Sequence, residues 1–190
     1  TELRLQLLEA AASRIGGFDL DAFQSSFGIS PAKPLGQILD DAKQVVQSLG
    51  DTGIHPVLGL SALARETLDD ASRKTAGAYH TDYRLAMHLA RSVESKLKPN
   101  IRVIDPACGA GILLAAVSVV ACGTDRILAN EWLRRSVYAA DLSPLALRGT
   151  LMSLAALTDD LSALCEMREK WRAHDSLLAP DEVWNAMAPE

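Results

Sequence analysis

The first third of the chain carries apolar side chains at the three- and four-residue spacing of amphipathic helices. One such face, in LRLQLLEAAASRI, stops at Gly16 and Gly17, as at a helix C-cap. A second, in LGQILDDAKQVVQSL, stops at Gly50, and a third helix is expected over residues 61–72. Residues 18–34 are expected to form a connector. These helices carry no chemical motif, so we expect them to serve packing.

After residue 74 the pattern changes, and short apolar runs alternate with helical stretches. We expect Asp82 to cap a helix whose apolar positions repeat every four residues from Leu85 to Leu97. IRVID (101–105) and SVYAAD (136–141) are predicted to be buried strands, and KWRAHDSL (170–177) is a weaker third candidate.

This alternation predicts an α/β fold with a doubly wound parallel sheet. The helix ILLAAVSVVA follows the first strand, and another helix begins at Ser143 and Pro144 after the second. We therefore divide the chain into an N-terminal helical region, residues 1–74, and a Rossmann-like domain, residues 75–190.

Composition indicates a soluble, cytoplasmic protein. Of its 190 residues, 48% are hydrophobic and 23% charged, and no apolar run is long enough for a membrane span. The net charge of -5 does not indicate the excess of positive charge that is typical of proteins that bind DNA or RNA. Cys108, Cys122 and Cys165 lack the spacing of a metal site, so we expect reduced, mostly buried thiols.

The stretch VIDPACGAGILLAA, residues 103–116, leads from a strand through a glycine turn into a helix. Gly109 and Gly111 permit a tight turn and the close approach of a ligand, and the following helix N-terminus attracts an anion. A dinucleotide site would require a third glycine where Leu114 stands, and a P-loop would require Gly-Lys-Ser/Thr. NAD is therefore disfavoured, and a P-loop is excluded.

Three predicted strands end in or near an acid, at Asp105, Asp141 and Asp175, and parallel sheets bind ligands at that edge. Asp141 alone could be a helix-capping acid or could accept both hydroxyls of a ribose. Together with the glycine turn, we favour the ribose. Leu142 follows in place of a basic residue, which argues against a 2′-phosphate, and it could pack on an adenine ring.

These blocks resemble the adenine-N6 DNA methyltransferases that use S-adenosylmethionine and act in restriction-modification systems. DPACGAGILL is similar to the first motif of that family. GAYHTDYRLAMHLA resembles the loop and helix before it, VYAADLSPLAL the second motif and HDSL the third. The blocks occur in family order over residues 75–177, a little over half of the chain.

The resemblance implies S-adenosylmethionine as the cofactor and assigns contacts along it. The methionine carboxylate would meet Tyr79 and Thr81, and Asp105 with the glycine turn would surround the ammonium. The ribose would bind Asp141, and the adenine would lie between Leu142 and Asp175. The implied cofactor-binding residues are Tyr79, Thr81, Asp105, Ala107, Cys108, Gly109, Gly111, Asp141, Leu142, Asp175 and Ser176.

The sequence departs from the family at His80 and Asp82, where a second aromatic residue and a proline are usual. Asp82 can still cap the helix, and His80 is either a polar contact of the carboxylate or a loop histidine. Family members grip the target amine with an Asp/Asn/Ser-Pro-Pro-aromatic motif, and this chain contains no Pro-Pro pair. We therefore name no catalytic residue and no metal ligand.

Two explanations fit the absent motif: an N-terminal piece of a longer enzyme, which we favour, or a degenerate protein that binds the cofactor without catalysis. DNA would then be bound by regions not in this chain. RNA and protein-glutamine methyltransferases share this type of site and stay open as alternatives, as does a module that binds a partner. We also expect the first strand to leave an apolar edge bare and to promote self-association.

Overall fold

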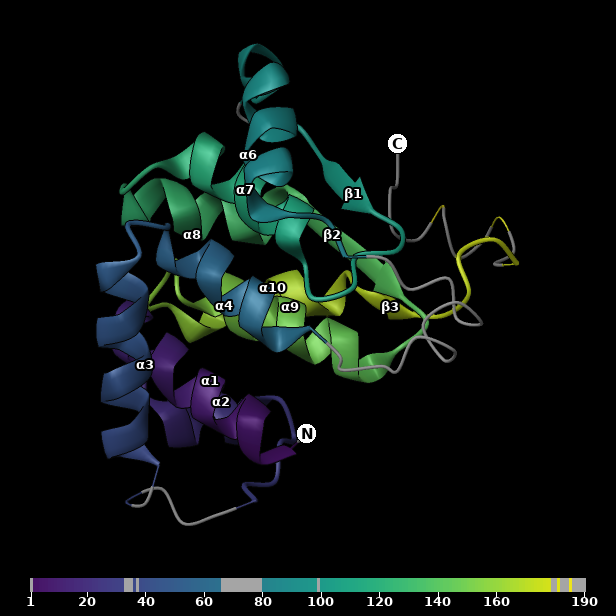
Figure 1. Cartoon of the computed structure of the whole chain (residues 1–190). Coiled ribbons are helices and arrows are strands. Elements are labelled where there is room, and N and C mark those ends of the chain that lie inside the picture. The colour runs from purple at the N-terminus through teal and green to yellow at the C-terminus, as the bar shows by residue number, and fades with distance from the viewer. Residues whose placement is uncertain are drawn as a thin grey trace.

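The computed structural model describes residues 2–32, 36, 38–65, 80–98, 100–178, 181 and 185. In these ranges the chain is a mixed α/β protein, mostly helical, with a small parallel sheet (Figure 1). The sheet has the order β1-β2-β3, with strands Val103–Asp105, Val137–Asp141 and Arg172–Ala173. Val103 lies opposite Val137, and Ala140 opposite Arg172. The α/β class and the parallel strands are confirmed, while the larger doubly wound sheet stays a prediction.

Helices form most of the fold. They are α1 (Glu2–Gly16), α2 (Leu20–Ser26), α3 (Leu39–Asp51), α4 (Pro56–Ala64), α6 (Tyr83–Ser92), the 3₁₀ turn η2 (Glu94–Lys96), α7 (Ile112–Cys122), α8 (Arg126–Arg135), α9 (Pro144–Ala155) and α10 (Leu161–Glu169). None of these helices combines the length and the apolar character needed to cross a bilayer.

The predicted helix starts are confirmed at two caps. The Asp82 carboxylate accepts a hydrogen bond from the Arg84 backbone N–H at the start of α6. The Ser143 hydroxyl accepts one from the Ala146 N–H, with Pro144 as the first residue of α9. Both contacts satisfy backbone donors that a helix start leaves unpaired.

Other expectations were wrong in detail. The expected connector contains helix α2, capped by Asp19, and α4 begins at Pro56 rather than at Ser61. The first strand is shorter than predicted and is not buried, since Ile104 on it is 39% exposed. The third strand has only two residues.

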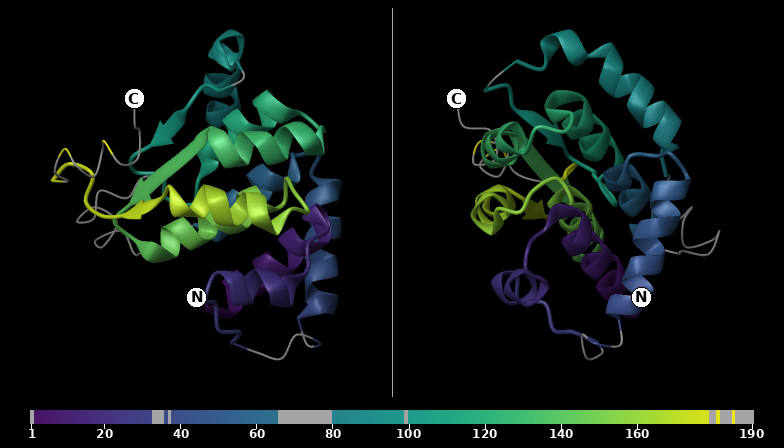
Figure 2. Two further views of the ribbon diagram at one scale, coloured as in Figure 1. Left: turned by 180° about the vertical axis from the view of Figure 1, so that it is seen from behind. Right: turned by 90° about the vertical axis from the view of Figure 1, so that its left-hand side faces the viewer.

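The N-terminal helices and the helices beside the sheet share one hydrophobic core. Helix α4 packs on α7 and α9, which contact strands β1 and β2, and Figure 2 shows the N-terminal helices gathered on one side of the molecule. Helix α1 also contacts α9 through a partly buried ion pair: the Arg148 Nε of α9 donates to the fully buried Glu9 carboxylate of α1 at 2.6 Å. The predicted domain boundary at residue 74 lies outside the described residues.

Strand β1 pairs with β2 on one side, and among the described residues no strand pairs with its other edge. An unpaired edge with an exposed apolar residue favours association. We expect light scattering at high concentration to show self-association that Ile104→Lys reduces. Ile127→Lys, which removes an 80% exposed isoleucine from α8, should have no such effect. A wild-type protein that remains monomeric would contradict this prediction.

Candidate functional site

The glycine turn between β1 and α7 is built on two residues with positive φ. Gly109 has φ +54° and Gly111 has φ +78°, a region in which side chains are strained. A Cβ on Gly111 would lie 2.5 Å from the Cγ2 of Thr150, whereas a Cβ on Gly109 would have no atom within 4 Å. The turn is therefore closely packed behind Gly111 and open at Gly109.

Side chains from three distant elements hold the turn by its backbone. The Gly109 N–H donates to the Asp141 carboxylate of β2 at 2.8 Å, and its carbonyl accepts from the Thr150 hydroxyl of α9 at 2.8 Å. The Ala110 carbonyl accepts from the buried Ser61 hydroxyl of α4 at 2.7 Å. The N-terminal helices thus do more than pack, because α4 supports the turn directly.

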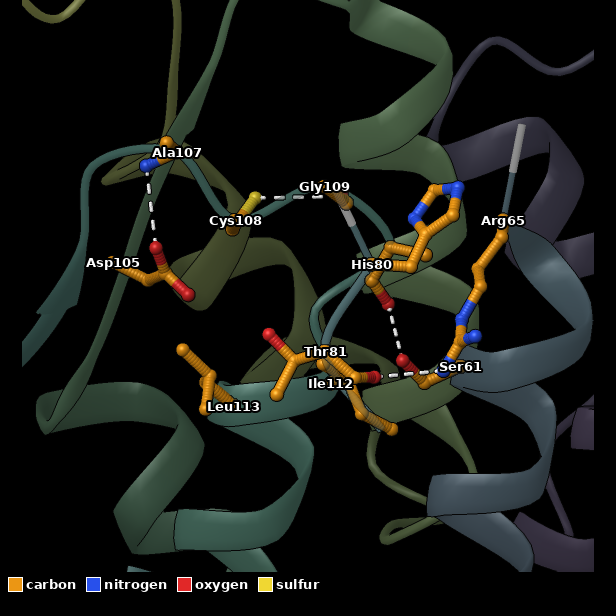
Figure 3. Close-up of a pocket in the computed structure, with 11 residues that line it drawn as sticks. Ser61, Arg65, His80, Thr81, Asp105, Ala107, Cys108, Gly109, Ile112 and Leu113 are labelled. Atoms are coloured by element: carbon orange, nitrogen blue, oxygen red, sulfur yellow. Dashed lines mark hydrogen bonds between the residues drawn. The ribbon is translucent and has the colours of Figure 1, made fainter. Parts of the chain in front are cut away.

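An open cleft lies in front of this turn (Figure 3). Its volume is about 60 Å³, so it can hold one end of a nucleoside ligand but not the whole. Five of the predicted site residues line it, namely Thr81, Asp105, Ala107, Cys108 and Gly109. The other lining residues are Ser61, Arg65, His80, Ala110, Ile112 and Leu113.

One side of the cleft is acidic, because the Asp105 carboxylate lies there. The Asp105 carboxylate accepts the Ala107 N–H at 3.2 Å. Burial raises the pKa of Asp105 above its ordinary value, and the charge of Asp141 raises it further, while the Ala107 N–H acts in the opposite direction. A positive group placed beside Asp105 would stabilise its ionised form, because an opposite charge offsets both effects that raise this pKa.

The basic side of the cleft comes from the helical region. Arg65 follows the last residue of α4, and its Nη2 donates to the Thr81 carbonyl at 2.8 Å. In Figure 3 the Arg65 side chain enters the cleft from one side and Asp105 stands on the other, with Thr81 between them. The cleft therefore presents opposite charges on its two sides.

The remaining predicted residues do not line this cleft. Asp141, at the end of β2, instead holds the turn, because its carboxylate accepts the N–H groups of Gly109 and Ser143. Leu142 beside it is 72% exposed. The Ser176 hydroxyl donates to the Pro106 carbonyl, and the exposed Asp175 accepts the Leu177 N–H at 2.9 Å.

Gly111 serves packing at the start of α7, and Tyr79 lies outside the described residues. Sequence patterns missed Ser61, Arg65 and Thr150, because no spacing connects residues that meet only through helix packing. Within the described ranges, no three His, Cys, Asp or Glu side chains come together as metal ligands would.

Cys108 lies in the turn but is not suited to nucleophilic chemistry. Burial raises the pKa of Cys108 and of Cys122 to about 12, and Cys165 is less buried than either. At pH 8 roughly one thiol in 10⁴ would be ionised at a pKa near 12. We expect iodoacetamide to label Cys165 first in the native protein and all three thiols in urea, as read by peptide mass spectrometry. Rapid labelling of native Cys108 would contradict this.

Comparison of the chain with family models, with curated proteins and with solved structures finds no match. The candidate site therefore stands on its own geometry and chemistry.

Proposed function

We propose that the cleft binds the amino-acid end of S-adenosylmethionine, and that the chain is the cofactor-binding part of a methyltransferase with a Rossmann-like fold. The observation that supports the proposal most is that Thr81, Asp105 and the glycine turn line one cleft at the carboxyl end of β1. Parallel sheets bind their ligands at this edge.

The ligand's chemistry agrees with the groups present. S-adenosylmethionine carries an ammonium, a sulfonium and a carboxylate but no phosphate. Its ammonium suits the Asp105 carboxylate, which lines the cleft, and its carboxylate suits the opposite side, where Arg65 lies. A dinucleotide would bring phosphate charges towards the Asp105 carboxylate, which favours S-adenosylmethionine over NAD.

The adenosine end would extend from the cleft over the end of β2. There the exposed Leu142 offers an apolar face to adenine, and the Asp141 carboxylate faces the turn. Each carboxylate oxygen of Asp141 accepts one backbone N–H and keeps a lone pair for a ribose hydroxyl. Asp141 would then hold the turn and the ribose at once.

The acceptor that fits the sequence motifs best is adenine-N6 of DNA in a restriction-modification system, with DNA bound outside this chain. RNA and protein-glutamine acceptors are the neighbouring alternatives. Since the chain lacks a Pro-Pro pair, we expect it to transfer no labelled methyl group to DNA on its own.

A thermal-shift panel tests the cofactor proposal. S-adenosylmethionine at 100 times its Kd should stabilise the fold by about 2.7 kcal/mol, whereas NAD and ATP at the same concentration should leave the melting temperature unchanged. A shift with NAD alone would favour a dinucleotide site. A shift with none of the three would favour the module that binds a partner.

A further inference from the structure

We propose that Arg65 binds the carboxylate of the methionine moiety, so that the N-terminal helical region supplies one half of the cofactor's amino-acid site. This inference rests on the proposed function and deepens it. It assigns recognition of the amino acid to two opposite charges on the two sides of the cleft, Asp105 and Arg65, which are forty residues apart in the sequence.

The position of Arg65 supports this role. Its own carbonyl accepts the Arg4 guanidinium of α1 at 2.7 Å, which fixes the backbone at the end of α4. Its side chain runs into the cleft and its Nη2 reaches the Thr81 carbonyl at 2.8 Å. A guanidinium has five N–H donors in a planar fork, so one bond to a carbonyl leaves the group able to bind a carboxylate as well.

The charges of the cleft point to a zwitterion in particular. A ligand with only a cation would satisfy Asp105 and leave the guanidinium facing an apolar or uncharged atom. A ligand with only an anion would satisfy the guanidinium and would bring like charge to the Asp105 carboxylate. An α-amino acid carries both charges as substituents of one carbon, and a cleft of about 60 Å³ is of a size for that end alone.

Paired ligands test the assignment on the full chain. Isothermal titration measures S-adenosylmethionine and its decarboxylated form, which differ by the carboxylate, on wild type and on Arg65→Met. We expect Arg65→Met to lower the affinity for S-adenosylmethionine about 10- to 100-fold, the usual effect of losing a hydrogen bond to a charged group. The affinity for the decarboxylated ligand should change less than about threefold.

Arg126→Met is the matched control. The Arg126 guanidinium also donates to backbone carbonyls, those of Ile15 and Gly16, and none of these residues lines the cleft. Its loss should therefore affect the binding of the two ligands equally. Urea titration checks that each variant is folded. If Arg65→Met does not fold, Arg65→Lys replaces it, with the same selective loss expected at a smaller size, because an ammonium lacks the planar fork.

The outcomes distinguish two failures. Equal weakening of both ligands by Arg65→Met means that Arg65 only supports the cleft, and the inference falls while the cofactor proposal stands. If wild type binds neither ligand, the cofactor proposal itself fails, and this inference with it.

Discussion

Gly111→Ala is expected to lower the free energy of unfolding by about 3 kcal/mol, from a left-handed backbone and a clash with a buried side chain. Gly111 has φ +78°, and its new methyl would lie 2.5 Å from Thr150, which is fully buried and bonded to the Gly109 carbonyl. The substitution should therefore displace Thr150 and loosen the turn. Urea denaturation followed by circular dichroism measures the loss.

Gly109→Ala is the matched control, because Gly109 has φ +54° and open space where its Cβ would be. It should cost about 1 to 2 kcal/mol, the strain of the backbone alone. Its methyl would instead enter the open space beside the turn. The loss of binding free energy for the ligand should therefore exceed the loss in the free energy of unfolding. Equal losses of stability in the two variants would show that the packing behind Gly111 does not support the turn.

Asp105→Asn is expected to stabilise the free protein against unfolding. It should also weaken the binding of S-adenosylmethionine by about 1.5 to 3 kcal/mol, the typical contribution of a hydrogen bond to a charged group. The amide oxygen can still accept the Ala107 N–H, so the turn keeps its contact. Removal of a partly buried negative charge relieves both its desolvation and its repulsion from Asp141. Calorimetry and urea denaturation measure the two effects separately.

The raised pKa of Asp105 also predicts how the effect of Asp105→Asn on stability depends on pH. Because the pKa of Asp105 is raised on folding, the ionised carboxylate destabilises the fold at neutral pH, and this cost is lost as pH falls through the raised pKa. The advantage of Asp105→Asn should therefore be present at pH 7 and should shrink on acidification. Ligand affinity of the wild type should fall over the same range.

Asp125→Asn controls for the change in net charge, since Asp125 also accepts a backbone N–H, that of Leu128 at 3.0 Å, but caps α8 away from the cleft. It should leave the affinity for S-adenosylmethionine unchanged. If Asp105→Asn destabilises the protein and binds the ligand as tightly as wild type does, Asp105 is a structural acid.

Local sequence signals predicted much of the fold. The alternation of apolar strands and helices located the three strands in the part of the chain that the structure describes, and the caps Asp82 and Ser143 located the starts of α6 and α9. Helices α2, α8 and α10 were not predicted, although each begins after an aspartate that caps it, at Asp19, Asp125 and Asp160. Each of these helices is short, with ten residues or fewer, and the aspartate cap is the local signal that could have located it.

The candidate site was predictable only where it is local in sequence. The turn from Asp105 to Gly111 is one segment, and its residue types indicate its geometry. Ser61, Arg65 and Thr150 reach the turn only because α4 and α9 pack together against α7, and that packing follows from the shared core rather than from any motif. The role of Asp141 in holding the Gly109 N–H also depends on strand pairing.

Titration of the purified wild-type chain with S-adenosylmethionine in a calorimeter tests the central claim most directly. We predict one binding event per chain, weakened in Asp105→Asn measured beside it. A chain that is folded by circular dichroism and yields no binding heat at several temperatures would contradict the assignment of this cleft to S-adenosylmethionine.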